Sequence, residues 1–246
     1  MNGAILLADI KSILLSKRTA LSVALMAAST VVVALIVQYS PSGLRAALAA
    51  SAPASAGVFE FMWFEDVMAL FFPLVIVGYG AFALCDLEDA DMTGLLLSRP
   101  ESRLSFLARR VAAAIASFLV VFLACSAVAA GIGAAAGGLD VGLFLVHQLM
   151  LLPLCLFVLG LTFFLSVPLR TTTPTALTSF AICLALYFAY SFLLAAGGGL
   201  PSPLNPMCMG HRMLVDASII ETATASLGYA CVLFAAGAVW FVKKDL

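Results

Sequence analysis

Six long runs that contain no Asp, Glu, Lys or Arg dominate the chain and constrain its fold more than any other feature. The runs occupy residues 20–37, 67–84, 111–130, 142–167, 175–196 and 223–242. A helix needs about 20 apolar residues to cross the roughly 30 Å hydrocarbon layer of a bilayer, where it must satisfy its own backbone hydrogen bonds. With 64% hydrophobic and 10% charged residues, the composition lies far from that of a soluble domain. The sequence therefore predicts an all-α integral membrane protein whose single domain, residues 1–246, crosses the bilayer six times.

Lysine and arginine are distributed unequally between the segments that connect these runs. If the N-terminus is cytoplasmic, ten basic residues lie on the cytoplasmic side and only Arg45 and Arg212 lie outside. The ten are Lys11, Lys17, Arg18, Arg99, Arg103, Arg109, Arg110, Arg170, Lys243 and Lys244. Because short cytoplasmic loops retain Lys and Arg, we expect a multi-pass protein of the cell membrane with both termini in the cytoplasm.

Residues 1–18 precede the first run and have an amphipathic pattern. Leu6, Ile10, Ile13 and Leu14 recur at helical spacing, with polar residues between them. This pattern predicts an interfacial helix that lies along the cytoplasmic leaflet. A plain cytoplasmic extension of the first span is the alternative.

The fourth run, residues 142–167, contains the unusual features His147, Gln148 and Pro153. The run is longer than a span needs, so it either begins in the interface or bends near the proline. The VPLRTTTPT sequence that follows predicts a tight turn into the fifth run. A histidine in a span invites a proton-relay interpretation. Its place near the outer end, beside Gln148, favours an interfacial or hydrogen-bonded histidine.

The segment 86–110 carries the densest charge in the chain. Four acidic residues come first, an apolar LLL sequence follows, and arginines lead into the third run. Because the residue before a proline disfavours helical geometry, this pattern predicts a short amphipathic helix that ends at Pro100. A solvated turn is the alternative interpretation of such a charge pattern.

The sequence LLLSRPESR, residues 95–103, resembles an element of the permease subunits of ABC-2 type transporters, with Pro100, Ser102 and Arg103 in the expected order. The C-terminal VWFVKKDL is similar to the usual ending of that family, and an interfacial helix before six spans matches its architecture over the whole chain. One part departs from the pattern. Asp91 and Met92 stand where the family has a Gly-Thr turn.

The resemblance implies that segment 86–110 is a cytoplasmic coupling loop that docks on a separate ATP-binding subunit. The chain has no GxxxxGK[ST] motif to cradle phosphates, so MgATP would be bound and hydrolysed in that partner. No residue of this chain receives a catalytic role, and a second permease copy or paralogue is implied. A net charge of −1 gives no indication of nucleic-acid binding. The coupling residues are expected to be Asp86, Glu88, Asp89, Asp91, Leu95, Leu96, Leu97, Arg99, Pro100, Ser102 and Arg103.

Between the fifth and sixth runs, residues 197–222 are apolar enough for a short outer re-entrant piece. They contain a dense set of soft donor atoms, in Met207, Cys208, Met209, His211 and Met213. Thioether, thiolate and imidazole ligands suit Cu(I), and one member of the same broad family serves copper-site assembly. Methionine is also a common gap-filler between helices, so packing is the stronger interpretation.

Two other classes of function compete with an exporter of hydrophobic or amphipathic molecules such as peptides, lipids or drug-like compounds. An intramembrane enzyme could hold a divalent metal on Asp86 and Asp89, but the chain offers no second acidic turn on the same side. A structural or assembly factor would carry out no transport. Uncharged spans suit an apolar cargo, although a surface that faces lipid has the same composition.

Overall fold

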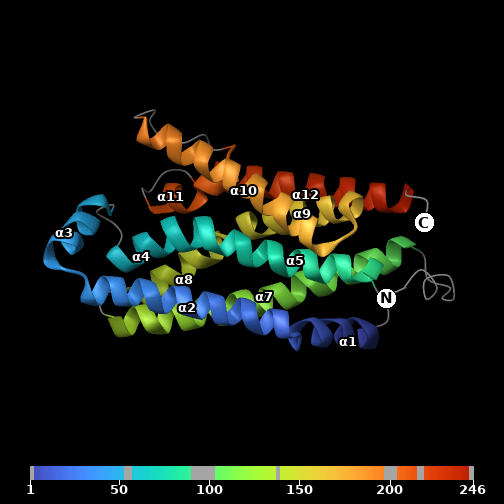
Figure 1. Cartoon of the computed structure of the whole chain (residues 1–246), viewed down its shortest axis with the longest axis horizontal. Coiled ribbons are helices and arrows are strands. Elements are labelled where there is room, and N and C mark those ends of the chain that lie inside the picture. The colour runs from blue at the N-terminus through green and yellow to red at the C-terminus, as the bar shows by residue number, and fades with distance from the viewer. Residues whose placement is uncertain are drawn as a thin grey trace.

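The computed structural model describes residues 3–52, 57–89, 103–136, 139–196, 204–214 and 219–243, and every element within them is a helix (Figure 1). The long helices lie side by side along the long axis, and α10 leans away from the others toward its C-terminal end. The elements are α1 (Gly3–Leu14), α2 (Lys17–Tyr39), α3 (Ser42–Ser51), α4 (Val58–Met62), the π-helix η1 (Trp63–Phe71), α5 (Phe72–Asp89), α7 (Arg103–Ala136), α8 (Val141–Met150), α9 (Leu152–Leu169), α10 (Thr172–Ala195), the 3₁₀-helix η2 (Pro206–Cys208), α11 (Met209–Leu214) and α12 (Ile219–Lys243).

Five helical stretches of the described residues are long and apolar enough to cross a membrane. They are Thr19–Tyr39, Leu104–Ala136, Val141–Leu169, Thr172–Leu193 and Ile219–Lys243. Each contains most or all of one of the charge-free runs, because a run without ionised side chains can remain in lipid. The architecture is that of an all-helical, multi-pass membrane protein.

The second charge-free run, residues 67–84, lies in a longer helical path rather than in a helix of its own. The path runs through α4, η1 and α5, and the residues at both junctions, Trp63 and Phe72, keep right-handed helical geometry. Its apolar α-helical part, Phe72–Ala81, is too short to count as a span by itself. A sixth crossing along this path stays a prediction.

An interruption of the helix at the position of the expected bend near Pro153 is confirmed. Helix α8 ends at Met150, Leu151 forms the junction, and Pro153 lies in the first turn of α9, where a missing N–H costs no helical hydrogen bond. The predicted tight turn is confirmed as well. Helix α9 ends at Leu169, Arg170 takes a left-handed conformation with φ 62°, and α10 begins at Thr172.

Helix α9 lies at the centre of the bundle, where α5, α10 and α12 pack against it. Its membrane-crossing stretch has the most buried side chains of the five, as a helix that is apolar all round requires. Glycines allow α12 to approach closely. A Cβ atom added at Gly160 would lie 3.3 Å from the Ala230 carbonyl oxygen, and one at Gly237 would lie 2.7 Å from the Phe163 ring.

The two termini lie at the same end of the bundle, to the right in Figure 1. Helix α1, the C-terminal end of α5 and the N-terminal end of α7 lie at that end too, whereas α3, α4 and α11 lie at the opposite end. Residues 1–18 were predicted to form an interfacial helix. The structure has α1 in this range, packed on α7, and its location at a membrane surface stays a prediction.

Candidate functional site

The predicted coupling residues flank the connection between α5 and α7. Asp86, Glu88 and Asp89 form part of the last turns of α5, and Arg103 is the first residue of α7. The helices extend into the predicted loop 86–110 from both sides, so the connection is shorter than expected. The remaining predicted coupling residues, with the amphipathic helix expected before Pro100, lie outside the described residues. They are Asp91, Leu95, Leu96, Leu97, Arg99, Pro100 and Ser102.

Next to this connection, an ion pair fastens α1 to the first turns of α7. The Asp9 carboxylate lies 3.3 Å from Nε of Arg109 and 3.8 Å from the guanidinium of Arg110. Arg109 is only 3% exposed and also stacks over the Phe106 ring, with 5.3 Å between its Cζ atom and the ring centroid. Two kinds of attraction for a cation, a carboxylate and an aromatic face, therefore meet at one arginine.

At the opposite end of the bundle, the helical path from α4 into η1 carries two glutamates that each bond to a histidine. Glu60 is 6% exposed, and its Oε1 atom lies 2.6 Å from Nδ1 of His147 on α8. Beside this pair, the Trp63 indole N–H donates to Oε1 of Gln148 over 3.0 Å. A buried carboxylate is costly unless it is paired and hydrogen-bonded, and these contacts meet that requirement while fixing α8 on the path.

Glu65 lies further along, on η1, and connects three elements. Its Oε1 atom is hydrogen-bonded to Nδ1 of His211 on α11, and its Oε2 atom accepts a 2.5 Å hydrogen bond from the Tyr190 hydroxyl on α10. Both carboxylate oxygens of Glu65 are therefore engaged, each by a different helix. Regions of π-helix within α-helical runs are frequent at functional sites, and η1 is such a region.

The polypeptide from 204 to 214 also touches η1 and α10 through its backbone and Asn205. A Cβ atom at Gly210 would lie 2.6 Å from the Phe64 carbonyl oxygen, so only glycine allows this approach. The Asn205 amide donates to the Leu186 carbonyl over 2.9 Å, and its own oxygen accepts from the Met207 N–H. These contacts place η2 and α11 against the glutamate-bearing path.

The soft-donor set predicted in residues 197–222 lies mostly in this packed interior. Met207, Met209 and Met213 belong to the hydrophobic core, and His211 is bonded to Glu65. The Cys208 thiol donates to the Asn205 carbonyl over 3.0 Å, and burial raises the pKa of this thiol, which disfavours the thiolate that metals bind. Among the described residues, no three His, Cys, Asp or Glu side chains gather as metal ligands. The copper alternative stays a prediction that this arrangement does not favour.

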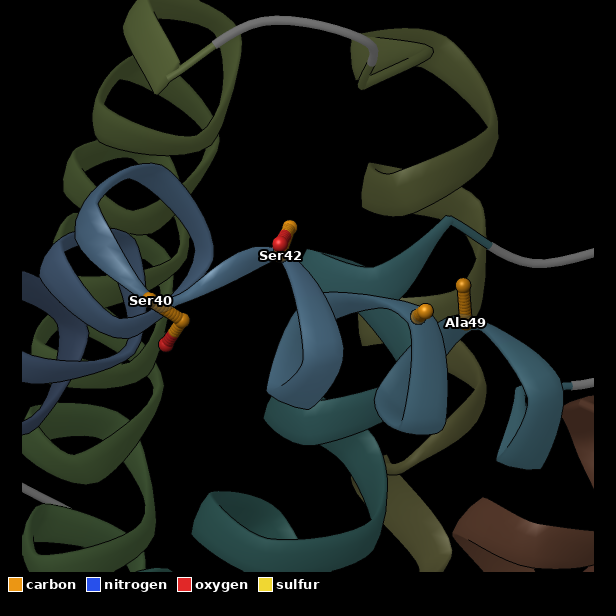
Figure 2. A pocket seen from close by; sticks show the side chains of 4 residues that line it. Ser40, Ser42 and Ala49 are labelled. Atoms are coloured by element: carbon orange, nitrogen blue, oxygen red, sulfur yellow. The ribbon is translucent and has the colours of Figure 1, made fainter.

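A surface hollow of about 440 Å³ lies where α2 meets α3 (Figure 2). Its lining consists of Ser40, Ser42, Ala46 and Ala49. Figure 2 shows Ser40 and Ser42 on the two sides of the link between these helices. Two hydroxyls and two methyl groups supply little specificity for a ligand, so this hollow is a weak candidate for a binding site.

Sequence reasoning considered His147 and His211 and missed their partners, Glu60 and Glu65. The predicted second span began at residue 67, which left both glutamates in an unassigned outer segment. A signal was present in the sequence FEFMWFED, residues 59–66, where acidic residues stand among large apolar ones. Acidic residues in such surroundings need buried partners, and the histidines near the outer ends of later runs are the available ones.

No protein-family model matches the chain, and no curated protein matches its sequence. The resemblance to ABC-2 permeases therefore stays a prediction that depends on the motifs in residues 95–103 and at the C-terminus.

Proposed function

We propose that this chain is the membrane-spanning permease subunit of an ABC-2 type transporter in the cell membrane. A separate subunit binds and hydrolyses MgATP, and the permease works with a second copy or a paralogue. Its cargo is a hydrophobic or amphipathic molecule such as a peptide, a lipid or a drug-like compound, which it exports. The chain itself is not an enzyme.

The observation that carries the proposal is the place of the connection between α5 and α7. This connection contains the LLLSRPESR sequence, and the helix ends on its two sides lie at the end of the bundle that has both termini (Figure 1). That end also carries most of the basic residues, which favours the cytoplasmic side. An ATP-binding subunit in the cytoplasm would therefore meet the connection directly.

Termini at one end of a bundle require an even number of crossings. Six crossings follow if the path through α4, η1 and α5 is counted with α2, α7, the α8–α9 pair, α10 and α12. Exposed apolar side chains on α10, among them Phe188 and Phe192, suit contact with lipid chains or with the second permease.

The Asp9 ion pair supports a mechanical role for the start of α7. A load applied at Arg103 by a closing ATP-binding subunit would pass along α7 to Arg109 and, through Asp9, to α1. Stiff helices and paired side chains carry such displacements because packed interfaces deform little.

Co-purification of the chain with its ATP-binding subunit, followed by ATPase assays in lipid nanodiscs, tests the proposal. We expect replacement of Arg99, Pro100 and Arg103 by alanine to reduce permease-dependent ATPase activity at least about tenfold, because charged contacts at a docking rim contribute to specific association. The matched control is Arg45→Ala, a single arginine on α3 at the opposite end, which should keep wild-type activity. Full activity in the triple variant, or no ATP-binding partner at all, contradicts the proposal.

A further inference from the structure

Residues 204–214 are here called the lid segment. This segment is too short to be stably folded without contacts to the rest of the protein. Its two helices have three and six residues, whereas isolated helices shorter than about 12 residues are marginal in water. Nevertheless, Met207, Cys208, Met209 and Leu214 are almost fully buried. The position of the lid segment therefore depends on its contacts with η1, α10 and α12.

Arg212 of the lid segment lies 4.0 Å from the exposed carboxylate of Glu221 on α12, whereas Glu65 makes closer and less exposed contacts. One carboxylate holds α10 through Tyr190 and the lid segment through His211. Close by, Gly210 lies against the Phe64 carbonyl, so the backbone of the lid segment packs directly on the backbone of η1. The hydrophobic effect that buries apolar side chains is not directional, whereas hydrogen bonds to an ionised group are directional and strong.

We propose that Glu65 is a latch that keeps the lid segment closed over this end of the bundle, and that loss of its bond to His211 lets the lid segment lift and expose its interior face. This inference does not depend on the transport function. It concerns only the Glu65 carboxylate, its partners Tyr190 and His211, and the lid segment.

The accessibility of Cys208 to a thiol reagent can report whether the lid segment is open. Cys208 has no exposed surface, and Cys85, Cys125, Cys155 and Cys183 are buried too, whereas Cys231 on α12 is exposed. In a Cys231→Ser background, a water-soluble maleimide should therefore label Cys208 only when the lid segment opens. Burial also raises the pKa of the Cys208 thiol, which slows the reaction further while the lid segment is closed.

The test compares maleimide labelling rates of purified protein in lipid nanodiscs. We expect Glu65→Gln and His211→Gln each to raise the rate at Cys208 roughly ten- to a hundredfold, the range set by a hydrogen bond to a charged group. The exchanged pair, Glu65→His with His211→Glu, should restore most of the protection. Cys208→Ser in the same background should abolish the signal.

Glu60→Gln is the matched control. It is the same substitution on the same helical path and also removes a glutamate–histidine bond, but its partner His147 lies on α8. Labelling of Cys208 should stay within about twofold of the background rate, and size-exclusion profiles of all variants should match. Any one of three results overturns the proposal. The Glu65→Gln variant could label at the background rate, Glu60→Gln could show an equal rise, or the exchanged pair could show no protection.

Discussion

Asp9 illustrates how one carboxylate adds a specific ion pair to a helix that also packs on the core through apolar side chains. Helix α1 has 12 residues, and the exposed Leu7 and the exposed Leu15 that follows it face away from the protein. On its other face, Ile13 is buried in the core, and Asp9 adds ion pairs to Arg109 and Arg110 of α7. Because Arg109 is buried, removal of this carboxylate would leave an uncompensated buried charge and would cost more stability than the same change beside a surface arginine.

Asp9→Asn tests this attachment. We expect it to lower the free energy of unfolding by about 1 to 3 kcal/mol, the contribution of a hydrogen bond to a charged group, and to lower the apparent Tm in detergent. Asp9→Glu keeps the charge and should recover most of the loss. Equal melting of Asp9→Asn and the wild type would show that α1 is held by apolar packing alone.

At the opposite end of the bundle, the buried Glu60 and the partly buried Glu65 each have a histidine partner. The partners are distant in sequence, with separations of 87 positions in the first pair and 146 in the second. Local pattern cannot indicate such pairs. It shows only that an acidic residue in apolar surroundings requires a partner somewhere.

Among the elements, α9 and α12 form the most extensively packed pair. Glycines at their contact allow the two helices to approach each other closely. Gly237 faces the Phe163 ring, which stacks on Phe234 with 5.6 Å between ring centroids. Gly228, on the same helix, has no atom within 4 Å of where its Cβ would be. Small residues at membrane helix contacts allow the backbones to approach in this way.

The two glycines of α12 should therefore respond to alanine in opposite directions. Gly237→Ala should destabilise the protein by about 1 to 3 kcal/mol, because the added methyl group overpacks the contact with α9. Gly228→Ala should be neutral or stabilising by up to about 1 kcal/mol, as expected from helix propensity. Thermal melts of both variants in one detergent provide the comparison, and a lower apparent Tm for Gly228→Ala than for Gly237→Ala would refute the packing argument.

The elements that sequence reasoning predicted are those whose signal is local. The charge-free runs correspond to α2, α7, the α8–α9 pair, α10 and α12, because exclusion of ionised groups from lipid acts on each run separately. The interruption between α8 and α9 was predictable from Pro153 because the effect of a proline on the backbone is also local. Helices α3 and α4 were not predicted, because they are short and lie between the long charge-free runs. The π-helix η1 overlaps the predicted second run at residues 67–71, but its π-helical geometry was not predicted.

At the scale of the whole molecule, the two ends of the bundle carry different sets of charged side chains. One end has both termini, the charged connection between α5 and α7, and the Asp9 ion pair. The other end has the glutamate–histidine pairs and the lid segment. Under the proposed function, a partner that hydrolyses ATP acts at the first end, and movements along α5 and α7 carry its effect to the second end.

The most direct test of this account is the sidedness of the connection between α5 and α7. In a Cys231→Ser background, Ser102→Cys should resist a membrane-impermeant maleimide on intact cells and react in inside-out vesicles, whereas Arg45→Cys on α3 should behave in the opposite way. Because a cytoplasmic ATP-binding subunit cannot reach an external segment, labelling of Ser102→Cys on intact cells would contradict the proposed coupling and the permease assignment with it.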